Sequence, residues 1–289
     1  MKSISYFTNS RLPLILFAAF ALTFTACEQE QIGDTIAEED VELAVTEAIV
    51  EASYDEVDDI AMEAMEQTDF TLDAREWEQE DLLTNGPCVV ITHDSVAKTI
   101  LIDFGTGCIG PDGKTRSGAI FVSYTKRLFH PGATLSVALQ NYMVDSLAIE
   151  GTRTITNLSP NYQANISLEK KLVGGKITWP DGTFATRDYI RTSTWVRAGN
   201  PAADEFHVDG SANAVRRNGN TYSASTLSTL IWKRRCLRKG VGIPVEGTTL
   251  IQRSNKPEVE IDFGNGVCDH LITITVNGFS KTVNVKDIK

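Results

Sequence analysis

Basic residues are nearly missing from one part of this chain of 289 residues. Residues 28–81 contain 21 acidic side chains and a single base, Arg75, which gives them a net charge of −20. Residues 82–289 contain 24 bases and 17 acids, a net charge of +7. A change of sign this large marks a compositional boundary. We therefore expect an acidic tether over residues 27–81 and a basic domain over residues 82–289.

Long apolar runs are also missing, apart from residues 12–24. That run is too short to span a bilayer, and it follows a basic start that contains Lys2 and Arg11. It ends at Phe24-Thr25-Ala26-Cys27, where small residues before a cysteine resemble the lipobox of bacterial lipoproteins. An ordinary secretory signal with a chance cysteine is the alternative interpretation.

The lipobox resemblance implies a signal peptide over residues 1–26 and lipidation of Cys27. Diacylglycerol would be attached to the sulfur, and an acyl chain such as palmitate to the new amino group. More than one acyl chain gives stable membrane anchoring. Glu28 and Gln29 follow the cysteine, without the Asp that would indicate inner-membrane retention. We expect the outer membrane of the cell envelope, on its periplasmic or surface face.

Complete signatures of catalysis are missing as well. Asp103-Phe104-Gly105 and Asp262-Phe263-Gly264 spell the metal-binding triplet of kinases, but the other kinase motifs do not accompany them. Residues 105–110 spell GxGxxG, yet turn residues and a strand follow where a dinucleotide site needs a helix. No Gly-x-Ser-x-Gly elbow occurs. The sequence therefore favours a protein that is not an enzyme, and we expect no cofactor.

One polar triplet in a predicted strand could hold a metal ion. Glu205, His207 and Asp209 alternate along the chain, so they share one face of the strand. A solvated strand face explains the same pattern. We do not assign a metal site to these residues.

The acidic segment shows helical periodicity of its apolar residues. It predicts two short amphipathic helices, roughly 39–52 and 54–67, with Ser53-Tyr54-Asp55-Glu56 as a capping box that starts the second. Residues 28–40 read as a solvated spacer kept extended by like charges. Residues 41–67 could remain part of that spacer or could dock on the basic domain.

From Cys88 onward the period of the pattern changes to two, which indicates β-strands. The predicted strands are Gly118–Leu128, Thr134–Val144, Leu147–Leu158, Thr183–Arg197, Phe206–Arg216 and Thr221–Trp232. Turn residues separate them, and no helix long enough for a crossover intervenes. The expected fold is mainly β: an antiparallel β-meander of a dozen or more strands in a curled or barrel-like sheet, preceded by the short acidic helices.

Some strands are unusually polar, above all residues 186–195. We expect one face of the sheet to be open to water. The buried face should contain large apolar residues, namely Ile120, Val122, Tyr124, Ile155, Trp195, Leu230 and Trp232.

A weak internal repeat organises four of the five cysteines. Ile-Asp-Phe-Gly-Thr-Gly-Cys ends at Cys108 and recurs as Ile-Asp-Phe-Gly-Asn-Gly-Val-Cys, which ends at Cys268. Each copy has a partner cysteine upstream of a strand pair, Cys88 or Cys236. This symmetry favours the disulfides Cys88–Cys108 and Cys236–Cys268 among the three pairings that four thiols allow. Export to an oxidising compartment permits them.

The repeated strings resemble those of uncharacterised envelope lipoproteins of Bacteroidota. The likeness includes residues 102–118, 150–157 and 175–183, and it extends from about Cys88 to the C-terminus. It implies lineage and location and brings no activity with it.

Two surface features suggest partners or modification. The densest positive patch flanks Cys236 and consists of Lys233, Arg234, Arg235, Arg238 and Lys239. It could meet an anionic glycan, lipid headgroups or the acidic segment of the same chain, or it could be a solvated hairpin end. Nucleic acid is not expected, because no groove with interleaved aromatic residues is readable. Thr35, Ser95 and Ser146 lie in triplets that resemble the O-glycosylation sequon of Bacteroidota.

Three functional classes follow from these observations. The favoured one is a lipid-anchored envelope lipoprotein that acts as a non-enzymatic binding or structural module. The alternatives place a site inside the curled sheet, either for a carried lipid or small hydrophobe or for a hydrolase. A cavity lined by Trp179, Trp195 or Trp232 would favour a carrier, and a filled core would count against it. A glycan hydrolase would need two carboxyl groups that face each other.

Overall fold

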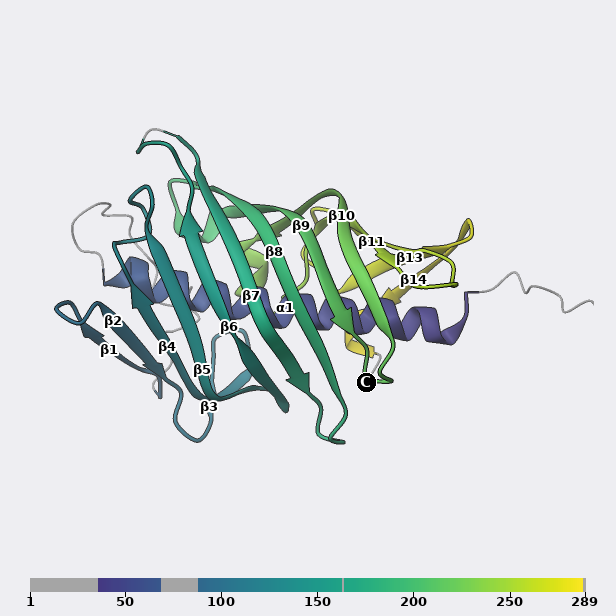
Figure 1. Cartoon of the computed structure of the whole chain (residues 1–289), viewed down its shortest axis with the longest axis horizontal. Helices are drawn as coiled ribbons and strands as arrows, with labels where there is room; N and C mark the ends of the chain where they lie inside the picture. Colours follow the sequence, from purple (N-terminus) through teal and green to yellow (C-terminus); the bar gives the residue numbers. More distant parts are fainter. Residues whose placement is uncertain (1–35, 69–87, 163, 288–289) are drawn as a thin grey trace, which may run out of the picture. The chain divides into compact units, whose positions relative to one another are not determined.

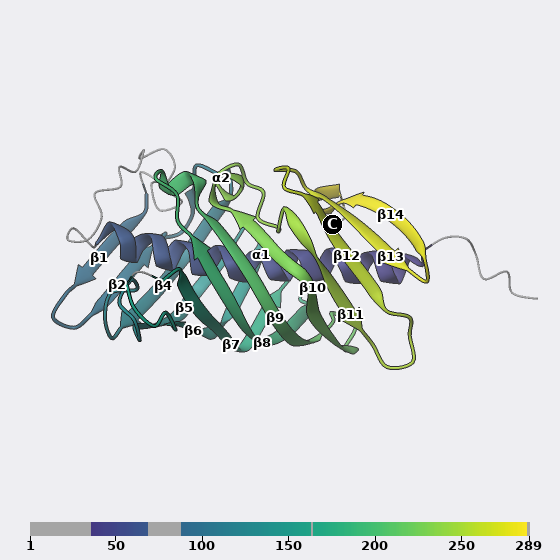
Figure 2. The same ribbon diagram turned by 90° about the horizontal axis from the view of Figure 1, so that it is seen from above.

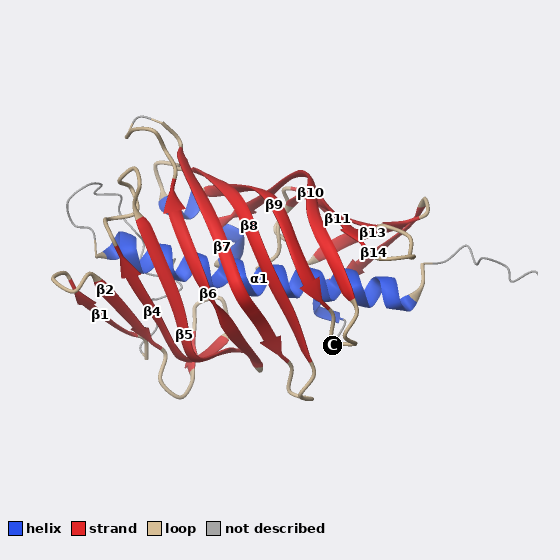
Figure 3. Ribbon diagram, in the orientation of Figure 1, coloured by secondary structure: helices blue, strands red, loops and turns tan. Residues whose placement is uncertain are grey.

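The computed structural model describes residues 36–68, 88–162 and 164–287. The described residues belong to one compact unit. A long helix lies against a single large antiparallel sheet (Figures 1 and 3). The predicted cleavage site, Cys27 and Thr35 lie outside the described residues.

The sheet contains 14 strands in the order of the sequence, with β3 paired only to β4. The strands are β1 (Val90–Asp94), β2 (Thr99–Asp103), β3 (Cys108–Ile109), β4 (Thr115–Tyr124), β5 (Thr134–Val144), β6 (Leu147–Asn157), β7 (Ile166–Thr178), β8 (Phe184–Val196), β9 (Glu205–Val215), β10 (Thr221–Lys233), β11 (Glu246–Gln252), β12 (Val259–Asn265), β13 (Leu271–Val276) and β14 (Phe279–Asn284). Neighbouring strands pair antiparallel, with Arg187 opposite Ala214 and Ala214 opposite Tyr222 as examples. The predicted meander is confirmed, and it remains open because β1 and β14, both described, do not pair.

Within the described residues, three short helical elements accompany the sheet. They are α2 (Arg234–Leu237), η2 (Pro201–Ala203) and η3 (Val285–Asp287). The predicted strand Thr134–Val144 has the same bounds as β5. The strand predicted over Gly118–Leu128 corresponds to β4, which ends at Tyr124. Strand β7 was not predicted, because two adjacent glycines, Gly174 and Gly175, and a run of polar residues interrupt its alternation.

The helix α1 (Glu38–Gln67) replaces the two short helices that the sequence predicts. Ser53 does not cap a second helix. Its hydroxyl donates to the carbonyl oxygen of Ile49, four residues earlier, at 2.8 Å, so the helix continues through the predicted break. The prediction of two helices is therefore wrong, and Glu38–Asp40, assigned to the spacer, already belong to α1.

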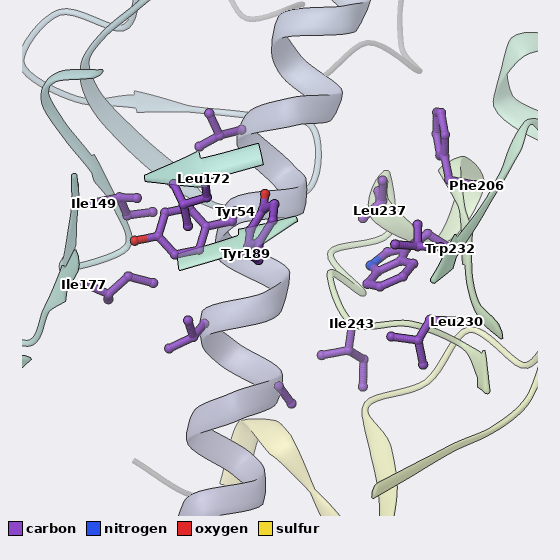
Figure 4. Packing of buried hydrophobic residues seen from close by; sticks show 14 of the residues in the cluster. Tyr54, Ile149, Leu172, Ile177, Tyr189, Phe206, Leu230, Trp232, Leu237 and Ile243 are labelled. Carbon is purple, nitrogen blue, oxygen red and sulfur yellow. The ribbon is translucent and has the colours of Figure 1, made fainter. Parts of the chain in front are cut away.

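The sheet curls around α1, which crosses the strands on their concave side (Figure 2). The helix contacts β2 and β4 near one edge of the sheet and β12 and β13 near the other. Side chains on opposite sides of the helix therefore reach different parts of the sheet. Tyr54 packs near Leu172 and Tyr189 on one side, while Trp232 and Leu237 lie on the other (Figure 4). The acidic segment thus supplies the centre of the β domain's core over its helical part.

Close packing of this helix requires a glycine in β7. A Cβ atom at Gly175 would lie 2.8 Å from the Tyr54 hydroxyl and 2.5 Å from the carbonyl oxygen of Arg187. The Tyr54 hydroxyl itself donates to the carbonyl oxygen of Glu150 at 3.1 Å. Of the predicted core residues, Tyr124 is half-buried and the other six are buried.

Candidate functional site

Buried charge is the main chemical feature of the interior. Eight acids of α1 are buried: Asp40, Glu47, Glu51, Asp55, Glu56, Asp58, Asp59 and Glu63. Eight bases outside α1 are also buried: Arg116, Arg153, Lys170, Arg187, Arg191, Arg216, Arg234 and Arg238. Isolated buried charges are costly, so each sign needs the other nearby. The acidic residues of α1 therefore pair with basic residues outside the helix in the interior of the protein.

Strand β8 provides one group of these bases. Arg187 Nη1 lies 2.5 and 2.6 Å from the two carboxylate oxygens of Glu47, and Arg187 Nη2 lies 2.7 Å from Glu51. Arg191 also pairs with Glu51, and with Asp55 at 3.4 Å. The Tyr222 hydroxyl donates to Glu47 at 2.6 Å. One helix face is thereby held by two strands, β8 and β10.

The polar residues of β8 were predicted to lie on a sheet face open to water, and this prediction is wrong for its arginines. Arg187 and Arg191 face the core together with Trp195, whereas Ile190 is 55% exposed on the other face. Alternation along the strand places Arg187 and Arg191 on the face of Trp195. Because Trp195 was predicted to be buried, this alternation is the signal that could have located the buried arginines.

A second group of charges lies further along the helix. Arg153 of β6 donates from Nε to Asp58 at 2.8 Å and also bonds the Tyr189 hydroxyl. Arg116 of β4 lies 2.8 Å from Glu56 and 2.6 Å from Asp112. Asp112 lies in the turn between β3 and β4. The helix is thus tied to strands that are far apart in the sheet.

The predicted positive patch is divided by the structure. Arg234 donates to Asp59 at 3.0 Å, and Arg238 Nη1 lies 2.9 Å from the same carboxylate. Both arginines are buried. Of the partners that the sequence suggested for this patch, they therefore contact the acidic segment of the same chain. Lys233 is half-buried and donates to the carbonyl oxygen of Gly266 at 3.1 Å. Only two members of the patch, Arg235 and Lys239, are exposed.

Burial and ion pairing shift several pKa values in this interior. Burial alone would raise the pKa of Glu47, but Arg187 and the Tyr222 hydroxyl hold it below its ordinary value. The pKa of Asp59 is also lowered, because Arg234 and Arg238 outweigh its burial. Burial raises the pKa of Glu51, and the neighbouring Asp55 and Glu47 add to the increase. These carboxyl groups hold the helix, and the cavities that border Asp59 and Glu51 have volumes of about 10 Å³ each.

The space between helix and sheet is filled. Trp195 and Trp232 are buried in it, and Trp195 donates to Asp204 at 2.8 Å. The cavity beside Trp232, lined also by Met62 and Phe206, has a volume of about 10 Å³. A cavity of this size holds about one water molecule. The filled core counts against the carrier alternative.

The opposite face of the sheet carries a larger concavity of about 590 Å³ over β8, β9, β10 and β11. Polar residues dominate its lining, among them Thr186, Asp188, Asn213, Thr221, Ser223 and Gln252. Asp188 lies opposite Asn213, Asn213 opposite Ser223, and Ser223 opposite Gln252. These four residues, which we call the polar row, cross four adjacent strands on one face. The sequence analysis did not find this site, because each strand contributes only one or two ordinary polar residues.

The remaining predicted sites are the two disulfides and the serines of two predicted O-glycosylation triplets. The disulfides Cys88–Cys108 and Cys236–Cys268 are both present, with Cα separations of 5.6 and 5.3 Å. Ser95 and Ser146 lie in exposed turns of the β1–β2 and β5–β6 hairpins.

The metal interpretation of the β9 triplet gains no support. His207 Nε2 lies 3.2 Å from Glu205, whereas Asp209 accepts from Thr229 at 3.0 Å. Within the described ranges, no cluster of three or more potential metal ligands occurs.

No helix in the described part of the chain is long and apolar enough to cross a membrane. Comparisons with protein-family models, with curated proteins and with solved structures find no match for this chain.

Proposed function

We propose that this chain is a lipid-anchored lipoprotein of the cell envelope, at the outer membrane, whose β domain is a non-enzymatic binding module. The observation that carries the proposal is the position of α1. The helix occupies the concave side of the sheet, where a carrier would hold its cargo, and its charges are paired there with those of the strands. A ligand must then bind elsewhere, and the outer concavity over β8–β11 offers the space.

The composition of the concavity argues for binding and against hydrolysis. Asp188 is the single carboxylate of its lining. Glycoside hydrolysis usually requires a pair of carboxyl groups on either side of the scissile bond. The concavity has a polar lining suited to holding a ligand by hydrogen bonds, without the second acid that such a reaction needs.

A short segment separates the proposed anchor from α1. Lipidated Cys27 would precede the first residue of α1, Glu38, by eleven residues. Such a length reaches at most about 40 Å when fully extended. Asp40, in the first turn of α1, lies 2.6 Å from Arg253, which lines the concavity. The first turn of α1 is therefore joined to the lining of the concavity.

The anchor is tested by replacing Cys27 with Ser. The variant should leave the membrane fraction of cells and appear in the soluble envelope fraction, with both disulfides intact on non-reducing peptide mapping. Retention of the variant in the membrane fraction would contradict lipid anchoring through Cys27.

The filled interior is tested with the same Cys27→Ser protein, purified without detergent. Native mass spectrometry should give the mass of the polypeptide alone. A lipid that copurifies at one molecule per chain would contradict the binding-module proposal and restore the carrier alternative.

A further inference from the structure

We propose that the outer concavity binds an uncharged oligosaccharide through the polar row Asp188, Asn213, Ser223 and Gln252. This inference rests on the proposed binding function and names the class of its ligand. The volume of about 590 Å³ lies in the range of small-molecule sites. Adjacent strands are separated by about 4.8 Å, so the row extends over about 14 Å, which suits a short chain of sugars.

The partners of the polar row leave groups free for a ligand. Asp188 accepts from the backbone N–H of Gly174 at 2.7 Å through one oxygen, and Gln252 donates to Glu258 at 2.7 Å. These hydrogen bonds orient both side chains. The second carboxylate oxygen of Asp188 and the amide oxygen of Gln252 remain available as acceptors for a ligand. Within the described residues, the side-chain amide of Asn213 forms no hydrogen bond.

Amides and hydroxyls each offer both a donor and an acceptor. Sugar hydroxyls also donate and accept, so a row of Asn, Ser and Gln side chains matches them group by group. Thr186 and Thr221 add two further hydroxyls to the lining. Phe184, two residues before Thr186 on the same strand face, is 48% exposed but lies outside this lining, with Lys176 Nζ 5.3 Å from its ring centroid. The amides and hydroxyls of the lining fit a polyhydroxylated ligand.

The charge of the site selects an uncharged ligand over an anionic one. Arg253 is the single base of the lining, and its guanidinium lies 2.6 Å from Asp40. The nearby Lys176 pairs with Glu150 at 3.0 Å. Asp188 therefore remains as the uncompensated charge, and it repels phosphate, sulfate or uronate groups. The exposed members of the positive patch, Arg235 and Lys239, lie outside this lining.

The test uses the full-length lipidated protein in nanodiscs and measures binding by isothermal titration calorimetry. The uncharged probes are maltohexaose, cellohexaose, laminarihexaose and mannohexaose, and hexagalacturonate is the anionic counterpart. We expect at least one uncharged hexasaccharide to bind and hexagalacturonate to bind more weakly. Asn213→Ala and Gln252→Ala should each weaken binding of that sugar by about five- to tenfold, since each removes a hydrogen bond.

The matched control is Gln140→Ala. Gln140 is an exposed glutamine of β5 outside the concavity, so its replacement should leave the affinity unchanged. All three substituted positions are exposed, and unchanged thermal unfolding would confirm that the variants are folded.

Three results would overturn the inference or its assignment of an uncharged ligand. One is failure of all four uncharged sugars to bind at millimolar concentration. Another is binding that Asn213→Ala and Gln252→Ala leave unchanged. Binding of hexagalacturonate alone, if weakened by Asn213→Ala, would also overturn the assignment of an uncharged ligand while the proposed binding function would stand.

Discussion

Arg187 and Glu47 are 140 positions apart in the sequence, yet Arg187 Nη1 lies 2.5 and 2.6 Å from the two carboxylate oxygens of Glu47. Both side chains are almost fully buried. Exchanging such a pair for apolar residues can leave stability unchanged, whereas removing one partner leaves a buried charge uncompensated. This relationship fixes which face of α1 meets strand β8.

Glu47→Gln should lower the free energy of unfolding by about 3 kcal/mol, because Arg187 and the Tyr222 hydroxyl lose their anionic partner. Urea denaturation at neutral pH measures the change. Glu39→Gln is the control, since Glu39 pairs with Lys256 at 2.8 Å on the surface and such pairs contribute little. Equal effects of the two substitutions would contradict the internal role of Glu47.

The contribution of Glu47 should depend on pH in a defined direction. Burial alone would raise its pKa in the folded protein, but Arg187 and Tyr222 stabilise the ionised form more strongly. The pKa is therefore below the ordinary value of 4.5. The stabilisation is therefore present above the ordinary pKa and is lost as pH falls through the folded pKa. The difference in stability between the wild type and Glu47→Gln should shrink in strongly acidic solution. A difference that grows on acidification would contradict this sign.

Glu51→Gln should be tolerated better than Glu47→Gln at neutral pH. Burial raises the pKa of Glu51, with contributions from Asp55 and Glu47 and against the opposing effect of Arg191 and Arg187. The ionised form of Glu51 therefore contributes less to folding than the ionised form of Glu47, whose pKa is lowered. A carboxyl group of this kind stabilises the fold most below its ordinary pKa, and that stabilisation is lost as pH rises through the folded pKa. Gln resembles the protonated form in shape. A larger loss for Glu51→Gln than for Glu47→Gln in urea denaturation would contradict this ranking.

Gly175→Ala should destabilise the protein by about 1–3 kcal/mol, because the added methyl group would overlap the Arg187 carbonyl oxygen and the Tyr54 hydroxyl. Gly199→Ala provides the control, since no atom lies within 4 Å of its Cβ position. Thermal unfolding of the two variants compares them directly. Similar melting temperatures would show that α1 does not pack against β7 as described.

Each disulfide should stabilise the domain by about 3 kcal/mol, mainly by restricting the unfolded chain. The bridges span 20 and 32 residues, so the gain from Cys236–Cys268 should slightly exceed that from Cys88–Cys108. The double replacements Cys88→Ser/Cys108→Ser and Cys236→Ser/Cys268→Ser, compared in urea, measure both. A wild-type stability in either variant would contradict a structural role for that bridge.

Hydrogen exchange should be slow along the centre of α1, because these residues are buried within the sheet. Pulse labelling read by mass spectrometry of peptides from residues 41–67 tests this. Rapid exchange throughout that segment would favour the solvated spacer that the sequence analysis left open.

Local rules determined much of this protein. The alternation of residues such as Ile120 and Val122, together with Gly and Asn turns, predicts the antiparallel meander, because period and turn chemistry are properties of short segments. The internal repeat likewise predicts both disulfides, since each bridge closes a local hairpin. The helical periodicity of residues 39–67 predicts helix, although it does not predict that Ser53 would bond backward and leave α1 unbroken.

Only the tertiary structure determines which acidic residues of α1 pair with which basic residues of the β domain. The sequence determines that an acidic segment precedes a basic domain, but it does not state whether Glu47 meets Arg187 or water. That outcome depends on the curl of the sheet, which brings strands far apart in sequence around one helix and makes pairing the way to avoid isolated buried charge. The polar row also depends on tertiary structure. Asp188, Asn213, Ser223 and Gln252 become neighbours only through the register of four strands, which side chains across the sheet set jointly.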